Sequence, residues 1–177
     1  ETNANVAYVN THAQLEALRD EALQQQSDGP RVMIVGPPES GKSSLARVLV
    51  AYATKLGRCP FWVDLDPADN AISVPGSIGV APMDQSALRV ETMASTGLPP
   101  SSTAAPLLLW YGHTTLSKHP DLFQAQVSAL SEKMERRFQQ DPDARASGMI
   151  VNTNGAVHDG EDGFQLLLHA IQALKIS

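Results

Sequence analysis

A glycine-rich run between an apolar and an amphipathic segment holds the residues best suited to bind a phosphate. It extends from Gly36 to Ser44 and has the form G-x-x-x-x-G-K-S, which is the phosphate-binding loop pattern. The backbone N–H groups of such a loop and the positive end of the next helix form an anion cradle. Lys42 would reach the β- and γ-phosphates of a nucleotide, and the Ser43 hydroxyl would bind Mg²⁺. The candidate nucleotide-binding residues are Gly36, Glu39, Ser40, Gly41, Lys42, Ser43 and Ser44. The alternative is a glycine turn that binds no ligand.

Two acidic residues end a second apolar segment. Residues 60–66 read as a buried strand that ends in Asp64 and Asp66. A carboxylate in this place can bind Mg²⁺ or accept a proton from an attacking hydroxyl. Because side chains alternate along a strand, both carboxylates should face the same side, and the spacing does not choose between them. Either residue could instead belong to a plain turn at the strand end.

A polar turn follows a third short strand. Residues 149–152 are apolar up to Asn152, and Thr153 and Asn154 come next. The carboxyl ends of strands carry the site in α/β sheets, so these three polar side chains are candidates for ligand contacts. Hydrogen bonds that only stabilise the turn explain the same residues equally well.

Gly and Pro residues separate the apolar segments of the chain, and this pattern predicts alternating strands and helices. We expect strands at 6–9, 32–35, 60–66, 107–111 and 149–152. The first helix should begin at Thr11, where Gln14 completes a capping box, and the second should end near Gly57. Further helices are expected from Pro120 to the Asp141 break and at the end of the chain. The predicted fold is a P-loop NTPase-like α/β domain with a mostly parallel sheet flanked by helices.

Two helices have apolar faces that predict how they pack. The faces are Phe123, Val127, Leu130, Met134 and Phe138 in one helix, and Phe164, Leu167, Leu168, Ile171 and Leu174 in the other. Arg136 and Arg137 belong to a charged face that is mostly solvated, although both could touch a phosphate.

Residues 67–106 hold Pro, Gly, Ser and Thr in irregular order, and Gly97 to Pro106 reads as an exposed, mobile loop. A stretch of this length without regular structure is unusual inside one domain and indicates a functional insertion or residues missing from the chain.

Composition limits the classes of function. The chain has 177 residues, about one domain, and a net charge of −6, which argues against a broad electrostatic grip on nucleic acid. A long apolar segment and a signal peptide are both missing, so the sequence predicts no membrane association. Its first residue is Glu1, and Lys175 to Ser177 directly follow a helical pattern. We therefore expect a fragment of a longer protein, truncated at both ends.

An ordered set of short motifs resembles the central ATPase domain of the polynucleotide 5′-hydroxyl kinase family. The chain is most similar to the Clp-type subunits of the nuclear mRNA cleavage-and-polyadenylation machinery. The phosphate loop alone is not specific to this family. The other motifs lie at residues 8–12, 29–33, 65–67, 74–76, 111–113 and 147–153. They cover nearly the whole chain.

The resemblance implies several properties that the residues alone do not. It implies a three-domain protein of which residues 1–177 are the central ATP-binding domain, and it implies ATP and Mg²⁺ as ligands. It places Asp66, with Ser43, at the Mg²⁺ site, because active members keep their general base at the position of Asp66. The adenine pocket and the lid arginines would lie outside this chain.

Departures from the active members imply lost kinase activity. Active kinases follow the aspartate with a variable residue and then Gly-Gln, whereas this chain has Pro67, Ala68 and Asp69. Active members also have a tryptophan that stacks on the substrate base, and Ala156 takes its place here. Base–aromatic stacking is worth ~1–3 kcal/mol. The chain is in this respect similar to the fungal branch of the family.

Three functions follow as hypotheses. The first is a nuclear, ATP-holding structural subunit that docks on the scaffold subunit of cleavage factor IA and contacts RNA weakly or indirectly. The second is an active RNA 5′-hydroxyl kinase with Lys42, Ser43 and Asp66 at its site. The third and weakest is a switch ATPase or GTPase, although the chain has no N-K-x-D guanine motif.

Overall fold

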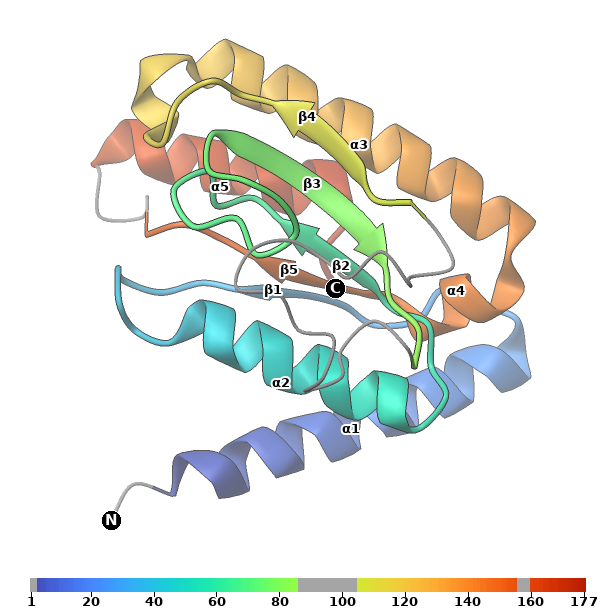
Figure 1. Cartoon of the computed structure of the whole chain (residues 1–177). Helices are drawn as coiled ribbons and strands as arrows, with labels where there is room; N and C mark the ends of the chain where they lie inside the picture. The colour runs from blue at the N-terminus through green and yellow to red at the C-terminus, as the bar shows by residue number, and fades with distance from the viewer. Residues whose placement is uncertain (1–2, 86–104, 156–159) are drawn as a thin grey trace.

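The computed structural model describes residues 3–85, 105–155 and 160–177, and it has a sheet with helices on both faces (Figure 1). The strand order is β1-β5-β2-β3-β4. The strands are β1 (Arg31–Ile34), β2 (Phe61–Asp64), β3 (Ser77–Pro82), β4 (Leu107–Trp110) and β5 (Met149–Asn152). Helices and strands alternate along much of the chain, which confirms the predicted α/β class.

The sheet is parallel where it carries the phosphate loop. Strand β5 lies between β1 and β2 and is parallel to both, and its Asn152 is in register with Ile34 and with Asp64. Strand β3 is antiparallel to β2 and to β4, so β3 alone among these strands runs against the others. The prediction of a mostly parallel sheet is therefore confirmed. The carboxyl ends of β1, β5 and β2 meet at one edge.

Strand β3 was not expected, since it lies inside the region predicted to be irregular. Its sequence includes Gly79, and a β-carbon at this residue would lie 2.6 Å from Leu108 Cδ2 and 2.8 Å from the Leu107 carbonyl oxygen. Glycine therefore lets β4 approach β3 closely. Such a residue weakens the pattern by which a strand is found. The expected loop at 97–106 lies outside the described residues except for its last two.

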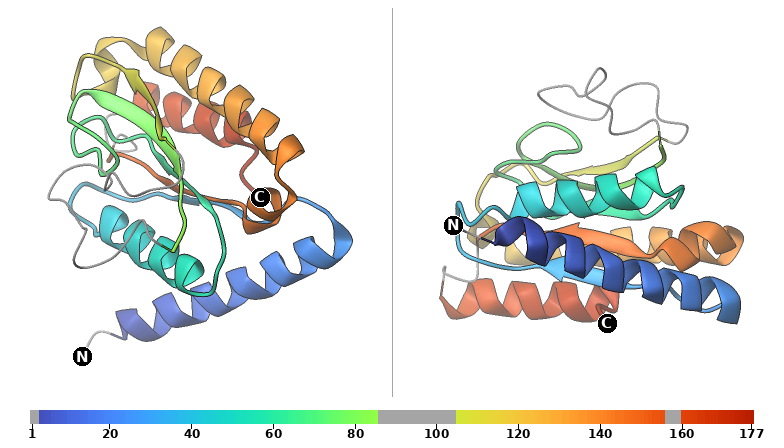
Figure 2. Two further views of the ribbon diagram at one scale, coloured as in Figure 1. Left: turned by 45° about the vertical axis from the view of Figure 1, so that its right-hand side comes forward. Right: turned by 90° about the horizontal axis from the view of Figure 1, so that it is seen from below.

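Helices α1 (Ala4–Gln25) and α2 (Lys42–Lys55) cover one face of the sheet, and α3 (Pro120–Gln140) and α5 (Glu161–Leu174) cover the other (Figure 2). The short α4 (Pro142–Ser147) and the 3-10 turn η1 (Leu116–Lys118) complete the elements. Alternate side chains of β2 enter the two halves of the core. Phe61 and Val63 pack toward α3 and α5, whereas Trp62 packs toward α1 and α2. None of the helices within the described residues is both long and apolar enough to cross a membrane.

The amino-terminal prediction was wrong. Residues 6–9 belong to α1 and not to a strand, and Thr11 lies inside the helix and does not begin it. The buried or half-buried side chains of α1 are Tyr8, His12, Leu15, Glu16, Arg19 and Ala22. Each lies three or four residues from another member of the set, as on one face of a helix. Three of them, His12, Glu16 and Arg19, are polar or charged, so the apolar pattern did not reveal this face.

The carboxyl-terminal helices match the predictions in part. Helix α3 begins at Pro120 and buries all five of its predicted apolar side chains, and Asp141 separates it from α4. Helix α5 differs from its prediction, because Phe164 is 46% exposed and the buried side chains include Leu166 and Ala170. Leu166 and Ala170 belong to the buried cluster that also holds Phe123 of α3, so packing within this cluster decides which face of α5 is buried.

Candidate nucleotide-binding site

The phosphate loop leaves β1 and enters α2 through a turn that requires left-handed backbone. Glu39 has φ 60° and Gly41 has φ 84°, and Gly41 is the N-cap of α2. A β-carbon at Gly36 would lie only 2.9 Å from Ser40 Oγ. Helix α2 begins at Lys42, so its first unpaired N–H groups belong to the loop. This arrangement is a concave anion cradle at a helix N-terminus.

The Lys42 ammonium group lies against the loop itself. Its Nζ donates to the Pro37 carbonyl oxygen at 2.7 Å, and Ser40 Oγ donates to the same oxygen at 2.8 Å. The side chain is 92% buried. A buried ammonium that has a single carbonyl partner keeps donor capacity for an anion.

The structure distinguishes the two aspartates that the spacing could not. Strand β2 ends at Asp64, and Asp66 lies beyond it in the following loop, so the expectation of one extended strand was wrong. Asp64 is fully buried. Burial raises the pKa of Asp64 to about 7 against the opposing effect of its hydrogen bonds. Asp66 is partly exposed and lies on a cavity with Lys42 and Ser43.

That cavity has a volume of about 740 Å³ and opens at the carboxyl edge of the sheet. Typical ligand pockets measure about 300–1,000 Å³, so it can hold a nucleotide phosphate chain. The phosphate-loop residues that line it are Pro38, Glu39, Gly41, Lys42, Ser43 and Ser44. The other lining residues are Asp66, Ala68, Asp69, Thr114, Thr115, Asn154 and Gly155. Gly36 and Ser40, which were also predicted to bind the nucleotide, shape the loop without lining the cavity.

Sequence reasoning missed the two threonines. Thr114 and Thr115 follow β4, and the sheet brings them to the cavity across a long separation in the chain. The signal that could have found them is their place just after a strand, because carboxyl ends of parallel strands share one edge.

The polar turn after β5 has more than one role. Asn152 is fully buried and contacts both Ser43 and Asp64. Thr153 Oγ1 donates to the Ile34 carbonyl oxygen at 2.7 Å and is buried, so this hydroxyl supports the turn. Asn154 lines the cavity. Thr153 thus stabilises the turn, whereas the side chain of Asn154 remains a candidate for ligand contact.

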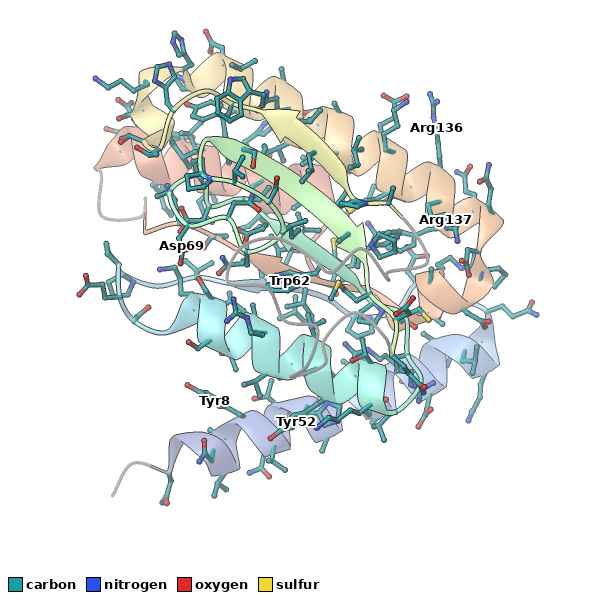
Figure 3. The ribbon with its side chains drawn as sticks, viewed as in Figure 1. Tyr8, Tyr52, Trp62, Asp69, Arg136 and Arg137 are labelled. Atoms are coloured by element: carbon teal, nitrogen blue, oxygen red, sulfur yellow. The ribbon has the colours of Figure 1, made fainter. Side chains whose placement is uncertain are left out.

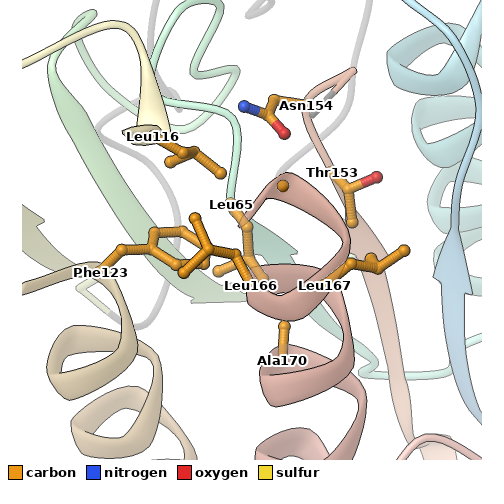
Figure 4. A pocket seen from close by; sticks show the side chains of 9 residues that line it. Leu65, Leu116, Phe123, Thr153, Asn154, Leu166, Leu167 and Ala170 are labelled. Atoms are coloured by element: carbon orange, nitrogen blue, oxygen red, sulfur yellow. The ribbon is translucent and has the colours of Figure 1, made fainter. Parts of the chain in front are cut away.

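Asn154 also borders a second, much smaller cavity of about 20 Å³ beneath the turn (Figure 4). The rest of its lining is almost wholly apolar and includes Leu65, Phe123 and Leu166. A space of this size holds about one water molecule. It is a gap in the packing between α5 and the sheet and cannot admit a substrate.

The arginines that could have touched a phosphate lie elsewhere. Arg136 and Arg137 are at the end of α3, far along the molecule from Asp69 (Figure 3). Each is exposed and forms an ion pair with a residue four positions away. Arg136 pairs with Glu132 of the same helix, and Arg137 pairs with Asp141, the C-cap. The predicted solvated face is thus confirmed, and neither arginine is among the residues that line the cavity. The position of Ala156 lies outside the described residues.

The cavity fits ATP and Mg²⁺ by its donor set. Mg²⁺ takes hard oxygen ligands and is often held by one or two protein groups together with substrate phosphates. The Ser43 hydroxyl and the Asp66 carboxylate are such ligands on the same cavity, and the cradle beside them suits a phosphate.

Comparisons with known proteins match the chain to a P-loop family. A family model described as the mRNA cleavage and polyadenylation factor CLP1 P-loop matches residues 36–177. A CLP1 homolog of Anopheles gambiae is 37% identical over 172 residues, which cover 97% of this chain and 38% of that protein. A CLP1 homolog of Arabidopsis thaliana is 38% identical over 178 residues, with the same coverage. The chain thus spans about 38% of the length of these relatives.

Solved structures give the same assignment. The chain is similar to a protein in a wild-type Clp1p–Pcf11p complex, with a TM-score of 0.82 and 29% identity over 96% of this chain and 40% of that one. A second structure concerns an extended Pcf11p–Clp1p interface and the basis of ATP loss in a glycine-to-arginine mutant, with a TM-score of 0.81 and 28% identity. Together with the family model, these likenesses show that the chain belongs to the CLP1 P-loop family of mRNA cleavage and polyadenylation factors.

Proposed function

We propose that residues 1–177 form the central ATP-binding domain of an mRNA cleavage and polyadenylation factor, and that it holds ATP and Mg²⁺ without turnover. One observation carries this proposal. Lys42, Ser43 and Asp66 line one cavity with the phosphate loop, and Ala68 and Asp69 line the same cavity. The first group suits a nucleotide, and the second does not suit an RNA end.

Each nucleotide-binding residue has a distinct part in the proposal. The backbone from Gly36 to Ser44 would hold the phosphates, and Lys42 would exchange its Pro37 carbonyl for a phosphate oxygen. Ser43 and Asp66 would hold Mg²⁺. When bound, ATP and Mg²⁺ supply an activated γ-phosphoryl group. Asp66 is the residue that would accept a proton from an attacking hydroxyl if one were presented.

The charge of the cavity lining argues against turnover. Among the described residues that line the cavity, Lys42 is the only cation, and Glu39, Asp66 and Asp69 are anions. Asp69 is exposed, and Ala68 beside it carries no hydrogen-bonding side chain. An RNA 5′ end would bring phosphodiester anions close to these carboxylates, and like charges repel each other. We therefore favour a site without kinase activity, as in the fungal branch of the family.

We place the protein in the nucleus and in a 3′-end processing complex. The solved structures to which the chain is similar are Clp1p–Pcf11p complexes. We propose a corresponding scaffold partner, the scaffold subunit of cleavage factor IA, for the protein that contains this chain. RNA contact would be indirect or weak.

The test is a phosphoryl-transfer assay on the whole protein. It is purified, its bound nucleotide is identified, and it is then incubated with labelled ATP and 5′-hydroxyl RNA. We expect ATP to co-purify intact and no label to reach RNA above the level of a Lys42→Ala control. Protein free of nucleotide, or one that hydrolyses its ATP, would contradict the proposal.

A second candidate is an active RNA 5′-hydroxyl kinase. The observation that favours it is the position of Asp66, which is partly exposed on the same cavity as Lys42 and Ser43. These residues provide what the nucleotide half of phosphoryl transfer needs. Transfer of label to RNA that depends on Lys42 and on Asp66 would establish this function in place of the first.

A further inference from the structure

The side chain of Asn152 connects the phosphate loop to a buried carboxylate. Its Nδ2 lies 3.3 Å from Ser43 Oγ and 3.1 Å from Asp64 Oδ1, and its Oδ1 lies 3.5 Å from Ser43 Oγ. Asn152 and Asp64 are both fully buried, while Ser43 is partly exposed at the cavity. Asn152 is therefore placed between the proposed cation ligand and the interior.

Asp64 continues the connection into the loop at residues 65–76. Its Oδ1 accepts from the Asp66 amide at 3.0 Å, and its Oδ2 accepts from the Ala71 amide at 2.9 Å. Both oxygens of one buried carboxylate thus hold the backbone of the loop that carries Asp66. Polar networks in such low-dielectric surroundings strengthen when all members are satisfied.

The same loop reaches the surface beside β4. The Gly76 amide donates to the Pro67 carbonyl oxygen at 2.7 Å, and the Gly76 carbonyl accepts from the Tyr111 amide at 2.8 Å. Trp110 rests its indole on Gly76, where a β-carbon would lie 2.9 Å from the ring, and is 67% exposed. Movement of the loop would therefore change the surroundings of an exposed tryptophan.

We propose that Asn152 is a positioning residue that couples the cation at Ser43 to the loop at 65–76 through Asp64. This inference rests on the proposed function, because it requires bound ATP and Mg²⁺. A serine hydroxyl has one donor and two acceptor lone pairs. When Ser43 Oγ gives a lone pair to a cation, its proton is directed to Asn152 Oδ1. The Asn152 amide is then held in one orientation, with Nδ2 donating to Asp64 Oδ1, and this orders the carboxylate that accepts from the loop amides.

Amide hydrogen exchange on the whole protein tests this coupling. Peptides that cover residues 64–76 are followed with and without ATP and Mg²⁺, and ATP affinity is measured in parallel. In the wild type, bound nucleotide should slow exchange of the Asp66 and Ala71 amides by about threefold to tenfold, the effect of one strengthened hydrogen bond. Asn152→Ala should still bind ATP but lose this difference.

Asn70→Ala is the matched control. Asn70 supports the same loop from within, since its Oδ1 accepts from the Ile72 amide at 2.9 Å and the Ser73 amide at 2.8 Å. Within the described residues, the hydrogen bonds of the Asn70 side chain do not involve Ser43, Asn152 or Asp64. This variant should exchange faster in both states and keep the nucleotide-dependent difference. A merely structural role for Asn152 would give the same result for both variants.

Ser43 variants keep the test decisive if Asn152→Ala fails to fold. Ser43→Thr keeps a hydroxyl and should retain the response to nucleotide, whereas Ser43→Ala should lose it at ATP concentrations that still saturate the site. The emission of Trp110 is obtained as the difference between the whole protein and its Trp110→Phe variant, and it should shift on ATP binding only where the hydroxyl and Asn152 are present.

The outcomes separate this inference from the proposed function. A wild type that binds ATP without slower loop exchange, or a folded Asn152→Ala that keeps the full difference, would overturn the coupling and leave the nucleotide-holding role intact. A wild type that binds no ATP would overturn both.

Discussion

The turn after β5 touches the phosphate loop, and this contact predicts how a small substitution will act on nucleotide binding. A β-carbon at Gly155 would lie 2.5 Å from Pro38 Cγ, 2.6 Å from its Cδ and 2.8 Å from its backbone nitrogen. Carbon atoms prefer separations of about 3.5–4.0 Å. In Gly155→Ala, therefore, the loop or the turn must move by roughly 1 Å.

The displaced atoms belong to the cradle, so the cost should appear in ATP affinity. Losing one hydrogen bond to a charged phosphate costs about 1.5–3 kcal/mol, and each 1.4 kcal/mol is about tenfold in affinity. We expect Gly155→Ala to bind ATP and Mg²⁺ about 10- to 100-fold more weakly. Titration calorimetry on the whole protein measures this, and thermal unfolding without nucleotide shows whether the fold is kept.

Gly160→Ala is the control for strain alone. Gly160 has φ 84°, and within the described part of the chain a β-carbon there would meet no atom closer than 4 Å. This variant carries backbone strain without reaching the phosphate loop, so it should lower stability and leave ATP affinity unchanged. If Gly155→Ala binds ATP within about twofold of the wild type, the Pro38 contact does not shape the cradle and the reasoning is wrong.

Three further predictions test the site and the fold. Lys42→Ala combined with Ser43→Ala should remove co-purified nucleotide, and unchanged nucleotide content, measured by chromatography, would contradict the assignment of these ligands. Asp66→Asn should weaken ATP binding by less than about tenfold and change no RNA phosphorylation, so a kinase rate that falls in this variant would argue for the active enzyme. Burial opposes ionisation of Glu135, but the Arg31 guanidinium outweighs it and holds the pKa of that carboxyl below its ordinary 4.5. This stability is present above about pH 4.5 and is lost as the pH falls through the lower folded-state value. Glu135→Gln should therefore cost ~1–3 kcal/mol near pH 7 and progressively less in acid, as chemical denaturation would show; a cost that does not depend on pH would refute this.

Local chemistry made the phosphate loop predictable. The spacing of Gly36, Gly41 and Lys42 indicates a phosphate-binding loop within a few residues, and in the structure α2 begins at Lys42, directly after this loop. Helix α3 was equally clear, because Pro120 begins it and its apolar side chains repeat along one face. In each case the determining residues are neighbours in the chain.

The predictions that were wrong concern elements whose structure depends on contacts between distant segments of the chain. Gly79 gives β3 a weak strand pattern, and only the nearness of β4 explains a glycine there. The face of α1 includes Arg19, which is buried because its guanidinium donates to the Ser147 carbonyl oxygen and pairs with Glu16. The roles of Asp64 and Asp66 depend on where β2 ends, and a shift of two residues moves a carboxylate from the core to the cavity.

Strand β5 lies between β1 and β2 although it comes after all the other described strands in the chain. A ribosome therefore releases the phosphate loop and Asp64 long before it releases the strand that joins them. Pairing of such distant segments is slow, because a long loop must close before the contacts form. Until β5 inserts, Asn152 is missing from the space between Ser43 and Asp64, and both edges that will receive it stay unpaired. The nascent domain should thus acquire nucleotide, and the stability that comes with it, only as synthesis of this region ends.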